Sequence, residues 1–354
     1  MVERFKVKMY KTGVLAGKFL PPHRGHLSAI INAATQCEIL YVVVSHSDSQ
    51  TEKLCKDSRC DYMSGIMRAT WLSQELQGFD HIKVLLLDES NIPEYPNGWA
   101  EWSQMLKEIV PAKIDVLFGG EPDYKKVNNI WFPESDYVLF DFSRERYPIS
   151  ATMIRNNPLE HWDYILGSAR PFFAKKILIA GTESVGKTTL TKYLAKIFHT
   201  SWSEEVGRYY SERYLGGRED GFSVEDFGRI AYLQYEADMD ALRHANRVVF
   251  YDTDAVITQY YCQLYLNKTS EIVESCVDPS RYDAVFFLSP SVKWVDDGLR
   301  VNSEQSLREK LDIKLWNMYI ERGFTNMFSI DGHGDYNKRL EQALAFTKYV
   351  LKEN

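Results

Sequence analysis

The sequence predicts an α/β protein with two domains, each built on a largely parallel sheet. The chain has 354 residues, and one hydrophobic core rarely serves more than about 250–300. Short apolar segments alternate with amphipathic ones, which is the pattern of strand–helix units. Pro171 interrupts a helical pattern just before a new apolar strand begins, so the domains are expected at residues 1–170 and 171–354.

The first domain contains apolar segments that predict strands, separated by amphipathic segments that predict helices at 25–36, 62–77 and 98–110. The strand segments are TGVLAGK (12–18), ILYVVVS (39–45), IKVLLLD (82–88), KIDVLFGG (113–120) and DYVLFDF (136–142). Strands joined through helices pair in parallel, so helices should cover both faces of this sheet.

The second domain repeats this alternation. Its strand segments are KKILIAGTES (175–184), NRVVFYDTD (246–254), YDAVFFLSP (282–290) and NMFSID (326–331). Helices are expected from residue 187, at 224–245, from 255, at 304–322 and from 335.

Composition restricts the classes of protein that need to be considered. A net charge of -7 disfavours nucleic acid as the main partner, because such proteins usually present a basic face. No apolar segment reaches the ~18 residues of a membrane span, and the N-terminus lacks the apolar region of a signal peptide. We therefore expect a cytoplasmic protein without a membrane span. The five scattered cysteines are expected to be reduced thiols rather than disulfides or a zinc site.

The segment GKFLPPHRGH, residues 17–26, places two histidines between a predicted strand and a predicted helix. Open α/β sheets bind ligands at this edge, where a helix N-terminus also favours phosphate. Imidazole N–H groups there are suited to hydrogen bonding with a triphosphate during phosphoryl chemistry. The alternative is a purely structural role in which His26 caps the helix.

A second segment completes a known pair of motifs. GKFLPPHRGH resembles the G-x-F-x-P-x-H-x-G-H signature of the nucleotidyltransferase superfamily, in its nicotinamide-nucleotide adenylyltransferase branch, and ISATMIR (149–155) resembles the companion I-S-x-T-x-x-R. The resemblance implies a Rossmann-like nucleotidyltransferase domain with His23, His26 and Arg155 as catalytic residues. The ATP-binding residues that it implies are Gly17, Lys18, Phe19, His23, His26, Ser150, Thr152 and Arg155.

These residues also suit adenylyl transfer on chemical grounds. Ser150 and Thr152 can start a helix whose backbone N–H groups face phosphate, and Arg155 lies one turn further on. When a substrate phosphate attacks ATP directly, catalysis is positioning and charge stabilisation, helped by Mg²⁺. Trp99 and Trp131 are candidates to stack on a pyridinium ring, with a place in the core as the alternative.

GTESVGKT, residues 181–188, matches G-x-x-x-x-G-K-[ST] between an apolar strand and a helix, the context of a P-loop. In this interpretation Lys187 binds the β- and γ-phosphates and Thr188 holds Mg²⁺. The residues expected to bind ATP here are Gly181, Thr182, Glu183, Ser184, Val185, Gly186, Lys187, Thr188, Thr189 and Arg300.

Carboxylates and arginines elsewhere in the second domain are candidates for the rest of a kinase site. Asp252 ends a strand and is the preferred second Mg²⁺ ligand, whereas Asp254 is better placed to cap a helix. Glu205 and Arg208 are candidates for the acceptor site, with a solvated helix start as the alternative. The segment 293–311 has the composition of a kinase lid, in which Arg300 and Arg308 would reach ATP and Trp294 the acceptor nucleoside. The alternative for residues 304–310 is a solvated charged segment.

An adenylyltransferase domain followed by a P-loop kinase domain resembles the NadR-type bifunctional enzymes, over nearly the whole chain. The resemblance implies that ATP phosphorylates nicotinamide riboside to nicotinamide mononucleotide (NMN), and that a second ATP converts NMN to NAD and pyrophosphate. Regulatory members carry an N-terminal helix-turn-helix, for which no room remains before GVLAGKF at residue 13. DNA-dependent repression is therefore not expected.

Two alternatives stay open. A phosphopantetheine adenylyltransferase fused to dephospho-coenzyme A kinase would contain both kinds of motif. A nucleotide-sensing protein coupled to a vitamin transporter such as one for nicotinamide riboside would need only the binding residues. The sequence leaves the oligomeric state open.

Overall fold

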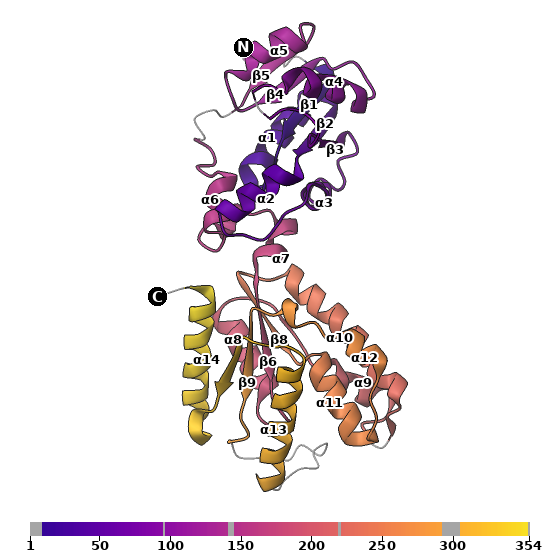
Figure 1. The fold of residues 1–354 in the computed structure, drawn as a ribbon, viewed down its shortest axis with the longest axis vertical. Helices are drawn as coiled ribbons and strands as arrows, with labels where there is room; N and C mark the ends of the chain where they lie inside the picture. The colour runs from indigo at the N-terminus through magenta and orange to yellow at the C-terminus, as the bar shows by residue number, and fades with distance from the viewer. Residues whose placement is uncertain (1–8, 95, 141–144, 219–220, 292–304, 353–354) are drawn as a thin grey trace, which may run out of the picture. The chain divides into compact units, whose positions relative to one another are not determined.

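The computed structural model describes residues 9–94, 96–140, 145–218, 221–291 and 305–352 (Figure 1). The chain divides into two compact units, Met1–Arg170 and Pro171–Asn354. Among the described residues, no helix is both long enough and apolar enough to cross a membrane.

The first unit has a five-stranded parallel sheet in the order β3-β2-β1-β4-β5. The strands are β1 (Tyr10–Gly17), β2 (Cys37–His46), β3 (Ile82–Asp88), β4 (Val116–Gly119) and β5 (Asp136–Leu139). The helices are α1 (Arg24–Ala34), α2 (Asp48–Asp57), α3 (Gly65–Glu75), α4 (Trp99–Ile109), α5 (Tyr124–Trp131) and α6 (Ala151–Asn156), and α7 (Arg170–Phe173) begins at the last residue of this unit. Because β1 pairs with both β2 and β4, the strand order reverses at β1, and its carboxyl end faces the crevice that binds ligands in such sheets.

Alternation along the strands supplies two apolar faces. Leu15, Val42 and Val44 share one core with Ile30 of α1 and Leu72 of α3. Val14, Tyr41 and Val43 share the other with Leu106 of α4. Helices therefore cover both faces, as the sequence predicted, and α1 is held with its first turn at the carboxyl end of β1.

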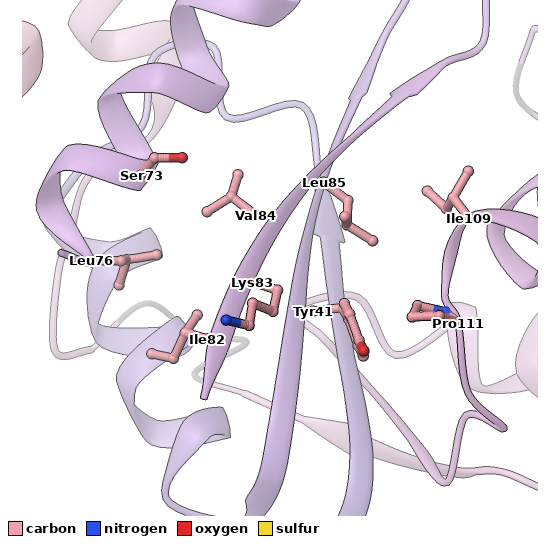
Figure 2. A pocket seen from close by; sticks show the side chains of 9 residues that line it. All are labelled: Tyr41, Ser73, Leu76, Ile82, Lys83, Val84, Leu85, Ile109 and Pro111. Atoms are coloured by element: carbon pink, nitrogen blue, oxygen red, sulfur yellow. The ribbon is translucent and has the colours of Figure 1, made fainter. Parts of the chain in front are cut away.

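A shallow hollow lies beside the edge strand β3, lined by Tyr41, Ser73, Leu76, Ile82, Lys83, Val84, Leu85, Ile109 and Pro111 (Figure 2). Its residues from β3, 82–85, belong to the amino-terminal half of that strand, and Tyr41 comes from the neighbouring strand β2. The hollow is therefore away from the carboxyl edge, where the motif loop leaves β1.

The second unit has another five-stranded parallel sheet, in the order β10-β9-β6-β8-β7. The strands are β6 (Lys175–Ala180), β7 (Trp202–Ser203), β8 (Val248–Asp252), β9 (Ala284–Leu288) and β10 (Met327–Ile330). The helices are α8 (Lys187–Ile197), α9 (Val206–Tyr214), α10 (Val224–Arg243), α11 (Ala255–Leu266), α12 (Glu271–Ser275), α13 (Gln305–Glu321) and α14 (Tyr336–Leu351).

Neighbouring phenylalanines of β9 show how this sheet is covered. The Phe286 ring contacts Phe346 of α14, whereas the Phe287 ring contacts Trp316 and Tyr319 of α13. Successive strand side chains point to opposite faces, so α14 and α13 lie on opposite faces of the sheet. Both sheets are parallel α/β sheets, as the sequence predicted.

Candidate active sites

His23 and His26 lie against each other at the start of α1. Their rings are stacked with centroids 3.7 Å apart. His23 is the N-cap residue, and its Nδ1 accepts the Gly25 N–H at 3.2 Å. The Nδ1 of His26 accepts the His23 N–H at 3.3 Å, which closes a reciprocal capping box.

This geometry determines the tautomer of both rings. A ring nitrogen that accepts a backbone hydrogen bond carries no proton, so in each neutral imidazole the proton is on Nε2. Both side chains therefore present an Nε2–H donor from one helix N-terminus. The structural role considered for His26 and the expected catalytic role are thus compatible, since different nitrogens perform them.

The loop between β1 and α1 is held by two buried arginines. Arg155 of α6 donates to the Leu20 carbonyl at 2.6 Å and to Thr152 Oγ1 at 3.1 Å. Arg68 of α3 donates to the Lys18 carbonyl at 2.5 Å. Phe19, between these carbonyls, has a φ of 47°, a conformation that is unfavourable for a phenylalanine and needs tertiary support.

The residues of ISATMIR come together with this loop. Ser150 caps α6 by accepting the Met153 N–H at 3.2 Å. Arg155 is only 6% exposed, so in this structure its guanidinium braces the loop rather than extending into solvent. Lys18 is exposed and donates to Gln50 Oε1 at 2.6 Å, and Gly17 ends β1.

The two candidate ring-stacking tryptophans lie at different edges of the sheet. Trp99 begins α4, near the carboxyl edge, and contacts Trp102 and Tyr124 edge-on. Trp131 ends α5 shortly before β5 begins, which places it at the amino edge, where it packs against the core. The structure therefore brings Trp99, but not Trp131, to the edge that contains the histidines.

The P-loop connects β6 to α8 and has the backbone conformation that its glycines allow. Gly181 has a φ of +143°, and a Cβ there would lie 2.8 Å from the Leu288 carbonyl oxygen. Gly186, the N-cap of α8, has a φ of +88°. The hydroxyls of Thr182 and Ser184 are buried and have no hydrogen-bond partner among the described residues, which suits a loop shaped for a polar ligand.

Lys187 and Asp252 are both buried at this loop, and the lysine charge acts on the carboxylate. Lys187 is 6% exposed, and its Nζ donates to the Thr182 carbonyl at 2.9 Å. Asp252 is fully buried at the end of β8, and neither carboxylate oxygen makes a regular hydrogen bond within the described residues. Burial and the nearby Glu205 carboxylate raise the pKa of Asp252 to about 7, against the opposing effects of Lys187 and the Thr188 hydroxyl.

These groups fit Mg²⁺ bound together with a nucleotide. Carboxylate and hydroxyl oxygens are the ligands that Mg²⁺ prefers, and a buried carboxylate with no regular hydrogen bond needs such a cation. The described residues contain no group of three or more His, Cys, Asp or Glu side chains able to hold a metal alone. Thr188 and Asp252 would therefore share the ion with phosphate oxygens.

The other predicted kinase residues lie in different environments. Asp254 caps α11 and accepts a hydrogen bond from the Tyr319 hydroxyl, which agrees with the capping role expected for it. Glu205 is half-buried beside Asp252, whereas Arg208 is exposed, as is Thr189. Arg308 of α13 is buried near Glu183. Trp294 and Arg300 lie outside the described residues.

Sequence reasoning missed two buried arginines. Arg68 holds the first loop, and Arg339 of α14 donates to the Val185 carbonyl of the P-loop at 2.5 Å. They are separated from these loop residues by 50 and 154 positions along the chain. Neither belongs to a motif, and a helical arginine is usually solvated, so the sequence contained no signal for them.

Comparison with known proteins identifies relatives over the full length. A family model described as an AAA domain matches residues 176–339. The chain is 32% identical over 349 residues to the trifunctional NAD biosynthesis/regulator protein NadR of Escherichia coli (strain K12), covering 96% of this chain and 83% of that protein.

Two crystal structures of NadR proteins superpose on nearly the whole chain. One, in complex with NR, has a TM-score of 0.81 at 26% identity and covers 99% of both chains. The other, in complex with NAD and AMP-PNP, has a TM-score of 0.79 at 27% identity and covers 98% of both. With its two parallel sheets and two phosphate-binding loops, the chain belongs to the NadR family.

Proposed function

We propose that this chain is a bifunctional enzyme of NAD biosynthesis. In this proposal residues 171–354 phosphorylate nicotinamide riboside with ATP, giving NMN and ADP, and residues 1–170 join NMN to the AMP moiety of ATP, giving NAD and pyrophosphate. The main support is that each unit has its own phosphate-binding loop at the carboxyl end of its own parallel sheet. The NAD biosynthesis role and ligands of the NadR relatives agree with both reactions.

Adenylyl transfer at the first site needs no protein nucleophile. An NMN phosphate oxygen attacks the α-phosphorus of ATP. The bond between the α-phosphorus and the oxygen that bridges it to the β-phosphorus breaks, and pyrophosphate leaves. The Nε2–H groups of His23 and His26 would donate to the triphosphate and stabilise the charge that moves onto pyrophosphate. Arg155 and Arg68 keep the loop in place, and Trp99 is the candidate for stacking on the pyridinium ring.

Phosphoryl transfer at the second site uses the P-loop. The 5′-hydroxyl of the riboside attacks the γ-phosphorus, the β–γ bridge bond breaks, and ADP leaves. Lys187 would neutralise charge on the β- and γ-phosphates, and Thr188 and Asp252 would hold Mg²⁺, which supplies charge neutralisation when bound. With Asp252 on the metal, the half-buried Glu205 beside it is a candidate to accept the hydroxyl proton.

Retention of the product links this chemistry to uptake. Phosphorylation adds a negatively charged phosphate group to the riboside, which prevents the product from returning through a carrier that is selective for the unphosphorylated riboside. We therefore also propose a cytoplasmic location and functional coupling to a nicotinamide riboside transporter. In cells that contain the Lys187→Ala variant, uptake of labelled riboside should stop once the riboside has equilibrated across the membrane. Continued accumulation of label would contradict the coupling.

A product assay tests the two activities. The purified chain is incubated with ATP and Mg²⁺ and either NMN or nicotinamide riboside, and the products are separated by chromatography. We expect NAD and pyrophosphate from the first substrate and NMN and ADP from the second. Turnover of phosphopantetheine and dephospho-coenzyme A instead would support the coenzyme A alternative, and tight NAD binding without turnover would support a sensor.

A further inference from the structure

We propose that Arg339 is a positioning residue of the kinase site: it holds the Val185 carbonyl and thereby directs the Gly186 N–H toward the phosphates of ATP. Arg339 lies on α14, far along the chain from the P-loop. This inference rests on one part of the proposed function, namely that the second unit binds ATP.

The buried Arg339 guanidinium donates several hydrogen bonds. The side chain is 2% exposed. It donates to the Val185 carbonyl at 2.5 Å, to the Ser289 carbonyl at 2.8 Å and to the Asp331 carbonyl at 3.1 Å. A fourth contact, to Ser291 Oγ, is 3.3 Å long. One guanidinium thus ties the P-loop to the residues that follow β9 and β10.

The local backbone is shaped to admit this side chain. Gly332 follows β10 with a φ of +65°, and a Cβ there would lie 2.9 Å from both the Cβ and the backbone nitrogen of Arg339. The Asp335 side chain caps α14 by accepting the Asn337 N–H at 2.8 Å. Arg339 therefore lies in the first turn and a half of a well-capped helix, which limits its freedom to move away from the loop.

Peptide geometry connects the Val185 carbonyl to phosphate binding. In a trans peptide the C=O and the next N–H point in opposite directions. Holding the Val185 oxygen toward Arg339 therefore turns the Gly186 N–H to the other side of the loop, where phosphate binds in P-loops. Ser184, just before Val185, has a φ of 62°, which is unfavourable for a residue other than glycine, so the loop needs an external contact to keep this shape. Gly186, just after Val185, adopts its φ of 88° without strain.

The charge on Arg339 adds a second effect. In the described part of the chain, no carboxylate oxygen lies within ion-pair distance of its guanidinium, which donates instead to carbonyls and a hydroxyl. Arginine stays protonated even when buried. Its positive charge therefore remains available to attract a triphosphate on the loop. Lysine would keep the charge but would lose the planar fork that reaches several acceptors at once.

The competing explanation is that Arg339 only docks α14 onto the sheet. That role predicts lower stability without a specific effect on nucleotide binding. Thr347 offers a matched control, because it is fully buried on the same helix and its hydroxyl donates to the Ala343 carbonyl within that helix. Thr347→Ala should weaken helix docking without touching the loop.

The experiment measures binding of AMP-PNP with Mg²⁺ by calorimetry to the full chain, with Lys187→Ala used to identify the P-loop signal. Arg339→Met should weaken this binding about 10-fold or more. Arg339→Lys should recover part of the loss, and Thr347→Ala should bind within about twofold of the parent chain. In the kinase assay the KM for ATP should rise in parallel, while the KM for riboside and the rate of NAD formation stay unchanged.

Three results would overturn the inference. One is unchanged AMP-PNP affinity in Arg339→Met together with a lower unfolding temperature. Another is an equal loss of affinity in Thr347→Ala. If Arg339→Met does not fold, an Arg339→Lys variant that binds AMP-PNP with the full affinity of the unsubstituted protein would also contradict the inference. A parent chain that binds AMP-PNP at the P-loop but does not phosphorylate riboside would contradict the proposed kinase function and leave this inference standing.

Discussion

Asp252 has lost its hydration on folding and gained no regular hydrogen bond among the described residues. Burial and Glu205 raise its pKa to about 7. The unfolded chain ionises this group near pH 4, so the folded state loses stability as the pH rises from about 4 to 7. We expect Asp252→Asn to stabilise the metal-free protein by on the order of 2–4 kcal/mol at pH 8, with no gain below pH 4.

Thermal unfolding across this pH range, without nucleotide or Mg²⁺, measures the effect. The same variant should lose riboside kinase activity, because the Asn side chain is a poorer Mg²⁺ ligand. A gain in stability that does not depend on pH would show that relieved packing, rather than removal of a buried charge, is responsible.

We expect His26 to have two functions that depend on different ring nitrogens. Its Nδ1 accepts the His23 N–H, and we propose that its Nε2–H donates to phosphate when ATP is bound. We expect His26→Ala to lower the rate of NAD formation by about 10²–10³-fold, the usual loss for one donor to a transition-state charge. Riboside phosphorylation should be unchanged, because the kinase loop belongs to the other unit.

The matched control is His81→Ala, which removes an exposed histidine that precedes β3 at the amino edge of the same sheet. It should leave NAD formation within about twofold of the parent chain. Similar losses in both variants would argue that destabilisation, and not the lost donor, explains the effect of His26→Ala.

Short helix α6 depends on its cap, because it has only six residues. Its N-cap Ser150 accepts the Met153 N–H, and its last turn contains Arg155, which holds the Leu20 carbonyl. We expect Ser150→Ala to lower the free energy of unfolding by about 1 kcal/mol. Because Arg155 loses its support, NAD formation should fall about tenfold as well.

Ser270→Ala separates these two effects. Ser270 caps α12 in the second unit by accepting the Val273 N–H. Its loss should cost a similar amount of stability while NAD formation stays at the parent rate. If Ser270→Ala slowed NAD formation as much as Ser150→Ala, the loop-bracing role of α6 would have no support.

The predicted and observed elements differ mostly where the sequence pattern is weak. The sequence pattern does not predict α2, whose sequence DSQTEKLCKD is mainly polar and buries only Thr51 and Cys55. It does not predict β7 either, because this strand has two residues and is defined by its pairing with β8. Elements with a strong apolar period, such as β2 and α10, were predicted close to their observed bounds.

The whole molecule has two loops with phosphate-binding motifs, each on its own sheet, so we expect the two reactions to be lost independently of each other. We expect Lys187→Ala to lower riboside phosphorylation by about 10³-fold, because a buried ammonium beside the β- and γ-phosphates is lost. NAD formation from added NMN should stay within about twofold of the parent rate. Loss of both activities would contradict this independence.

The sequence by itself determined the two α/β units and the positions of both motif loops, and it predicts ATP-binding roles for His23, His26 and Lys187. These features depend on local periodicity and on residue types at fixed spacing, which a single chain displays directly. It also favoured Asp252 over Asp254, because a residue just before a helix is a probable cap, and Asp254 does cap α11.

Only the tertiary structure decided which distant side chains support these loops. Arg68 and Arg339 donate to carbonyls that are remote along the chain. Trp131 lies at the sheet edge opposite the histidines, because α5 runs antiparallel to the strands. Such contacts depend on how helices pack across a sheet, and no local pattern encodes that packing. The loops can thus be found in the sequence, whereas the groups that hold them in a binding conformation appear only after folding.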